Sequence, residues 1–136
     1  MPIAQHDPVR DFLRQQGAPY HFISSGLRGL VENWERVADM VVKGYDLPLD
    51  DYLADMDTRE LLANALDVAP PALRETFRDR ITRADERMKA AVIPAGRCLW
   101  GQIVADEEGW REDREWWYFT RPRQAGPRLL EELHEA

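Results

Sequence analysis

Residues 30–43 read LVENWERVADMVVK and contain the clearest structural pattern in the chain. Their apolar side chains recur every three or four residues, the spacing that places them on one face of an α-helix. Charged residues fill the other positions, and Gly44 is a residue type that commonly ends a helix. The pattern therefore predicts an amphipathic helix whose buried stripe consists of Leu30, Val31, Trp34, Val37, Ala38 and Val41.

The segment before this helix predicts a second, shorter one. Asp7 and Pro8 match a helix N-cap followed by proline at the first helical position. Gly17 then ends the short helix. We expect residues 18–23 to form an extended connector, after which a serine of the pair Ser24–Ser25 caps the long helix.

Three more helices are expected further along the chain. Residues 45–54 predict a short helix. Asp57 and Glu60 have the spacing of a capping box, which predicts that a new helix starts at Asp57. The prolines at 70–71 end that helix and open another, which we expect to run to about Ala91.

The last third of the chain has a different character. Residues 98–104 and 114–120 are rich in aromatic and β-branched side chains, which favours strands. We expect them to pair as a β-hairpin within residues 97–121, joined by the acidic loop 105–113, and to be followed by a terminal helical turn over residues 127–136. The alternative is irregular aromatic packing without strands.

Together these patterns predict a mainly α protein (α+β) in which four to five helices pack with a small, aromatic-rich β-hairpin near the C-terminus. The length of 136 residues corresponds to one domain, so we expect a single domain over residues 1–136 with its helical part over residues 1–93. A chain of this size buries about two-thirds of its unfolded surface. It therefore needs neither a disulfide nor a metal to fold.

Composition predicts a soluble, cytoplasmic protein. The apolar runs are far shorter than the ~20 residues that span a bilayer, so no membrane association is expected. Residues 1–7 lack the basic and apolar regions of a secretory signal. Cys98 is the single cysteine, so the chain cannot form an internal disulfide, which indicates a reducing compartment.

The charge distribution argues against nucleic acid as a partner. The formal net charge is -7, whereas binding to a phosphate backbone needs a positive face. The negative charge is concentrated in two segments: residues 31–67 carry 10 acidic and 3 basic side chains, and residues 98–115 carry 6 acidic and 2 basic ones. A basic protein fits this distribution better.

The sequence contains no set of residues that predicts catalysis, a cofactor or a metal. Asp55 and Asp57 have a spacing seen in metal sites, but the segment lacks the glycine and the terminal glutamate of a calcium loop. Cys98 fits a small buried apolar residue better than a nucleophile. No two of the histidines have the spacing of a zinc site, and each is explained without chemistry: His6, His21 and His134.

The aromatic residues of the expected hairpin are the most unusual feature. Alternation along a strand would leave both faces of the hairpin apolar. One face can pack on the helices, and the other is covered either by Leu129, Leu130 and Leu133 or by a partner. In the second case it would be an exposed aromatic patch with an acidic rim of Asp106, Glu107, Glu108, Glu112, Asp113 and Glu115.

We therefore expect a non-enzymatic interaction protein, such as an inhibitor or antitoxin-like neutraliser of a basic partner. Tryptophan and tyrosine are enriched at binding hot spots, and an acidic rim steers a basic partner. One alternative is a small-molecule binder or enzyme with an aromatic-lined pocket at Trp34, Trp100 and His21. Another is a homodimer formed through the aromatic face. The expected binding residues are Trp100, Trp110, Trp116, Tyr118, Asp106, Glu107 and Glu108.

Overall fold

The computed structural model describes residues 7–135, so the expectations for residues 1–6, including His6, and for Ala136 lie outside it. Over the described range the protein is mainly α, with a small two-stranded antiparallel sheet near the C-terminus, which confirms the predicted fold class. The elements are α1 (Pro8–Gln15), α2 (Tyr20–Lys43), α3 (Leu49–Val68), α4 (Pro71–Ala90), β1 (Val92–Pro94), α5 (Gln102–Glu108), the 3-10 turn η1 (Trp116–Tyr118), β2 (Thr120–Pro122) and α6 (Pro127–Glu135).

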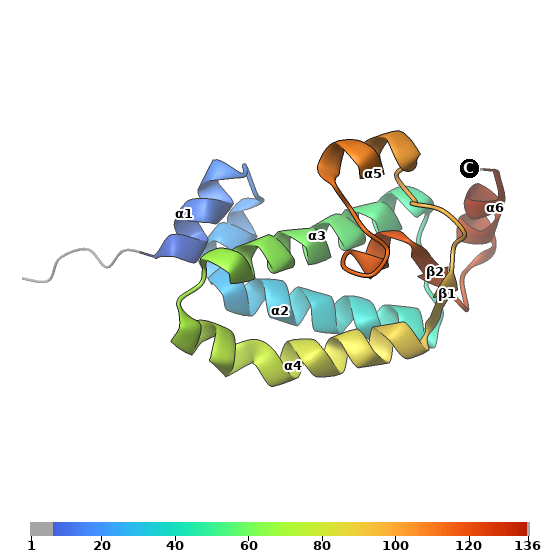
Figure 1. Ribbon diagram of the computed structural model, residues 1–136. Helices are drawn as coiled ribbons and strands as arrows, with labels where there is room; N and C mark the ends of the chain where they lie inside the picture. The colour runs from blue at the N-terminus through green and yellow to red at the C-terminus, as the bar shows by residue number, and fades with distance from the viewer. Residues whose placement is uncertain (1–6, 136) are drawn as a thin grey trace, which may run out of the picture.

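The long helices α2, α3 and α4 form the body of the molecule and run in alternating directions (Figure 1). The helix α2 packs against both α3 and α4, and α1 closes one end of the bundle against α2 and α3. All six residues of the predicted α2 stripe are buried. Burying each large apolar side chain stabilises the fold by about 1.5–3 kcal/mol, so this stripe is the centre of the core.

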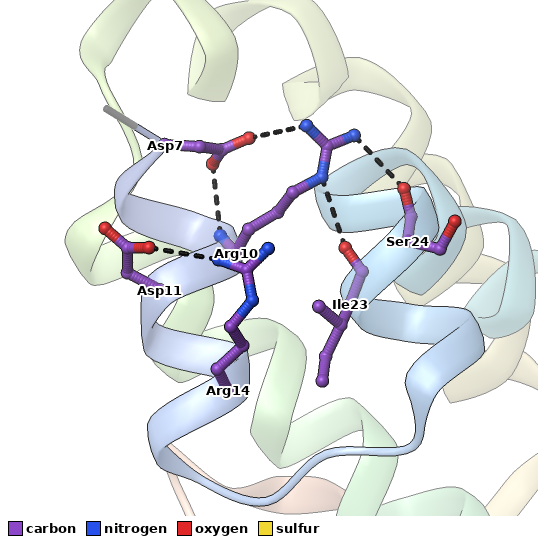
Figure 2. Close-up of polar contacts among 6 residues, drawn as sticks. All are labelled: Asp7, Arg10, Asp11, Arg14, Ile23 and Ser24. Atoms are coloured by element: carbon purple, nitrogen blue, oxygen red, sulfur yellow. Dashed lines mark hydrogen bonds and ion pairs between the residues drawn. The ribbon is translucent and has the colours of Figure 1, made fainter. Parts of the chain in front are cut away.

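The helix α2 begins earlier than predicted. Residues from Tyr20 onward are helical, so the expected extended connector is wrong. The helix is kinked at Gly26, where the backbone has φ 65° and ψ -148°. The kink leaves the carbonyls of Ile23 and Ser24 without helical partners, and the guanidinium of Arg10 donates to both at 3.1 Å (Figure 2). A side chain from α1 thereby replaces the missing backbone hydrogen bonds.

The region after α2 forms one long helix, α3, where two were predicted. Buried residues continue at helical spacing across the expected break, with Leu53, Met56 and Leu62 all on the core side. Asp57 therefore lies inside the helix and caps nothing, so its predicted capping role is wrong. Pro48 precedes the first helical residue, and proline is well tolerated near a helix start.

The small sheet exists, but its strands lie outside the predicted ones. β1 and β2 pair antiparallel with the register Val92↔Pro122, Ile93↔Arg121 and Pro94↔Thr120. The segment predicted as the first strand forms a turn and most of α5, and the second predicted strand contains η1. The aromatic side chains pack on helices from a folded-back segment, so they do not need the alternation of a strand.

The C-terminal helix is present over Pro127–Glu135, close to its predicted position. It packs against α3 and buries Leu129 and Leu133, whereas Leu130 stays largely exposed. Within residues 7–135, none of the helices combines the length and the apolar character needed to cross a membrane.

Candidate functional site

Asp57 attaches the C-terminal aromatic segment to the bundle. Its carboxylate oxygen Oδ1 accepts a hydrogen bond from the Tyr118 hydroxyl at 2.7 Å and from the indole Nε1–H of Trp100 at 3.0 Å. The two donors are 18 residues apart in sequence, and Asp57 lies on α3. One acidic side chain therefore holds two points of residues 98–119 against the same helix.

Tyr118 forms the inner layer of the aromatic segment. Its side chain is 1% exposed, and its ring stacks on Trp110 with a centroid distance of 3.8 Å and an interplanar angle of 15°. Burial and the hydrogen bond to Asp57 raise the pKa of Tyr118 well above its ordinary value. Trp110 is half-buried and covers it. Of this predicted pair, only Trp110 reaches the surface.

Trp116 lies half-buried beside the bundle. Its ring centroid is 6.3 Å from that of Trp34 on α2, and Nζ of Lys89 on α4 lies 5.1 Å from its ring centroid. A cation–π contact of this kind contributes about 0.5–1 kcal/mol near the surface. The structure therefore places Trp116 as a packing residue that presents only part of its ring to solvent.

A buried ion pair behind the aromatic segment escaped sequence-based prediction. Arg59 on α3 donates through Nε and Nη2 to the two carboxylate oxygens of Asp85 on α4, at 3.1 and 2.9 Å. The indole Nε1–H of Trp34 donates to the same carboxylate at 2.7 Å. The guanidinium carbon lies 4.3 Å from the ring centre of Trp117. This cluster links three helices and supports η1 from below.

Exposed acidic side chains gather on α5 and the turn that follows it. Glu115, expected in the acidic rim, is instead buried and accepts a hydrogen bond from the backbone N–H of Arg111 at 2.8 Å. Arg111 also pairs with the exposed Asp113 at 2.8 Å. The exposed acids of this region are Asp106, Glu107, Glu108, Glu112 and Asp113.

Two apolar side chains lie exposed beside these acids. Trp100 is 41% exposed even though its indole is fixed by Asp57, and Ile103 is 75% exposed at the start of α5. Residues three and four apart share a helix face, so Ile103 lies on the same face as Asp106 and Glu107. The surface formed by Trp100, Ile103, Asp106, Glu107 and Glu108 is named the acidic edge below.

A cavity of about 420 Å³ lies next to the acidic edge, between α3 and residues 108–117. Its wall includes Glu60, Asp67, Glu108 and Glu115, with Arg114 as the one basic side chain. Burial, and then repulsion from Glu115, raise the pKa of Glu60 to about 7. The negative charge of the acidic edge thus continues inward along α3.

The second aromatic face is covered mainly by the bundle. Trp117 and Tyr118 are buried, and η1 packs against α3. Leu129 and Leu133 are buried where α6 meets α3, so their burial is explained by another contact. The aromatic patch is therefore smaller than an exposed hairpin face would be, and its accessible ring surface belongs mostly to Trp100, Trp110 and Trp116.

The residues weighed for chemistry are spread over the molecule. His21 lies exposed on α2 against the ring of Phe22, and Cys98 is a buried free thiol. Asp55 accepts a hydrogen bond from the Tyr45 hydroxyl at 2.6 Å and so has a different partner from Asp57. Among residues 7–135, no three or more His, Cys, Asp or Glu side chains are grouped as metal ligands would be.

Comparisons of this chain with protein-family models, with curated proteins and with solved structures find no match. The site is therefore interpreted from its own geometry.

Proposed function

We propose that this protein is a non-enzymatic interaction module that binds a basic protein partner through the acidic edge. The observation that carries the proposal is the placement of two exposed apolar side chains, Trp100 and Ile103, among exposed carboxylates on α5. An apolar anchor with a charged surround is the usual composition of a binding hot spot and its rim. Neutralisation of a basic toxin or enzyme is the activity that fits this partner.

The geometry supports a preformed surface. Asp57 fixes the Trp100 ring, so little side-chain entropy is lost when a partner covers it. The Trp110–Tyr118 stack supports the segment from within. The net charge of -7 adds long-range attraction for a basic partner, which speeds association at low salt. The proposal includes a reducing, cytoplasmic compartment, in agreement with the buried free thiol of Cys98.

The alternative of an aromatic-lined small-molecule pocket has weaker support. Trp34 is fully buried and bonded to Asp85, Trp100 faces Asp57, and His21 lies exposed on α2. These residues belong to separate environments.

The proposal is tested by capture from a lysate of the source cells at low salt, followed by affinity measurements on the purified captured protein. The test variant combines Asp106→Lys and Glu107→Lys on α5. The matched control combines Asp79→Lys and Glu86→Lys, two exposed acids on α4, and changes the net charge equally. We expect the α5 variant to weaken binding at least about tenfold, equivalent to about 1.4 kcal/mol, and the α4 control to weaken it much less.

A third variant, Trp100→Ala, tests the apolar anchor. We expect it to slow association little and to accelerate dissociation, because hot-spot contacts act after the encounter. Equal losses in the α5 and α4 variants would show that only net charge matters and would overturn the acidic edge as the binding surface. Light scattering that reveals a stable homodimer disrupted by Trp100→Ala would favour self-association instead.

A further inference from the structure

A second cavity, remote from the acidic edge in chemistry, lies between α6 and the strands at the end of the bundle (Figure 1). Its volume is about 540 Å³, within the range of small-molecule sites. Three segments supply the wall: the connection after β1, strand β2 and helix α6. The lining residues are Ala95, Gly96, Arg97, Leu99, Arg121, Leu130, Leu133 and His134.

The polar side chains of this cavity are all basic. Arg97, Arg121 and His134 line it, and of the residues that the structure describes no acidic side chain does. This is notable in a chain with 25 acidic and 18 basic residues. Arg97 donates through Nη2 to the carbonyl of Leu133 at 3.1 Å, which holds its guanidinium at the C-terminal end of α6. The cavity thus concentrates positive charge in a negatively charged protein.

Arg121 carries the strongest indication of a ligand. Its Nε atom is buried and has no hydrogen-bond partner. A buried N–H without an acceptor is costly, and the guanidinium fork matches a carboxylate or phosphate with two parallel hydrogen bonds. Arg121 pairs through its backbone with Ile93 in the sheet, so the side chain projects from a fixed position. An anion in the cavity would provide the missing acceptor.

The rest of the wall is apolar. Leu99, Leu130 and Leu133 contribute to it, and Leu130 is 40% exposed. Apolar surface beside a guanidinium favours an anion that carries an apolar group over a free inorganic ion, since burial of that group adds binding energy. We propose that this cavity binds a small organic carboxylate, with the carboxylate at Arg121 and its apolar chain against the leucines. This site is independent of the proposed function at the acidic edge.

The test is a titration of the full chain with sodium hexanoate, followed by nuclear magnetic resonance of the arginine Nε–H groups and the backbone amides. We expect saturable binding in the low millimolar range, as suits a ligand of few atoms. The shifts should centre on Arg121, Leu130 and Leu133. Hexanamide has the same shape without the charge, and inorganic phosphate has the charge without the chain. We expect each to bind at least about tenfold more weakly than hexanoate.

Two variants complete the experiment. Arg121→Gln removes the guanidinium and should weaken hexanoate binding at least about tenfold. Arg123→Gln removes an exposed arginine two residues away that does not line the cavity, and it should leave binding unchanged. Absence of saturable hexanoate binding to the unmodified protein would overturn the proposal, as would equal binding of hexanamide. The hexanamide comparison needs no variant, so a folding defect in Arg121→Gln leaves the test intact.

Discussion

Replacement of Arg59 by methionine should destabilise the protein strongly, because it leaves Asp85 without its countercharge. The Arg59 side chain is 8% exposed and that of Asp85 is 19% exposed. The substitution removes two charge-assisted hydrogen bonds and the contact with the Trp117 ring, while Asp85 keeps only the indole N–H of Trp34. Removing one partner of a buried pair costs about 3–5 kcal/mol. Since Asp85 retains some solvent contact, we expect about 3 kcal/mol.

Urea denaturation measures this free energy of unfolding directly, and thermal denaturation should show a fall in Tm of about 10–15 °C at this chain length. The matched control is Arg78→Met on α4, whose ion pair with Glu75 is exposed and should contribute less than about 1 kcal/mol. The double variant Arg59→Met with Asp85→Asn removes both charges and keeps an acceptor for Trp34, so it should recover part of the loss. A loss for Arg59→Met no larger than that of the control would refute this account of the pair.

Three further outcomes are expected. Gly26→Ala should cost about 1–3 kcal/mol of unfolding free energy, because the backbone at φ 65° and ψ -148° is accessible almost only to glycine; urea denaturation of Ser24→Ala, which keeps the carbonyl bonded to Arg10, should show less than about 0.5 kcal/mol. Asp57→Ala should cost about 1–3 kcal/mol, because it leaves the buried Tyr118 hydroxyl without an acceptor, whereas Asp57→Asn should cost less; equal losses in urea denaturation would contradict this role. Glu60 has a pKa raised to about 7 in the folded state, so its contribution to stability is fully present below its ordinary pKa near 4.5 and is lost as pH rises through 7. Glu60→Gln should therefore gain stability relative to the unmodified protein between pH 5 and 8, and parallel pH profiles of unfolding free energy would exclude that contribution.

The helical part of the fold follows from local patterns, but only where those patterns are unambiguous. The α2 stripe and the proline-initiated start of α4 were predicted because periodicity and proline position act locally. The start of α2 was missed because the kink at Gly26 is stabilised by a side chain from another helix, Arg10. The false break before Asp57 arose because a capping-box pattern is equally compatible with the middle of a helix.

The strand positions could not be predicted from composition. Residues 114–120 have a strong strand preference, yet packing against the bundle places Trp116–Tyr118 in a 3-10 turn. Tertiary contacts outweigh local preference at such positions.

The candidate site was predicted in part. The acids Asp106, Glu107 and Glu108 are exposed as the sequence indicated, because charged residues outside a buried pair remain at the surface. The burial of Tyr118 depends on Asp57, which is 61 residues away in sequence. Arg59 offered one sequence signal, since it shares a helix face with Met56 and Leu62, but its partner Asp85 lies on another helix. Whether the acidic edge binds a partner stays a prediction.

The ends of the aromatic segment are tied together by backbone hydrogen bonds, from Ala95 N–H to the Phe119 carbonyl at 2.9 Å and from Leu99 N–H to the Tyr118 carbonyl at 2.8 Å. The bundle therefore encounters this segment as a closed loop whose entry and exit are fixed by the strand register. Doubling the length of a flexible loop adds only about 0.6 kcal/mol of closure cost. Insertions and deletions within residues 102–113 can thus remodel the exposed surface while the helices keep their arrangement, which makes this loop the natural place to change the specificity of the protein.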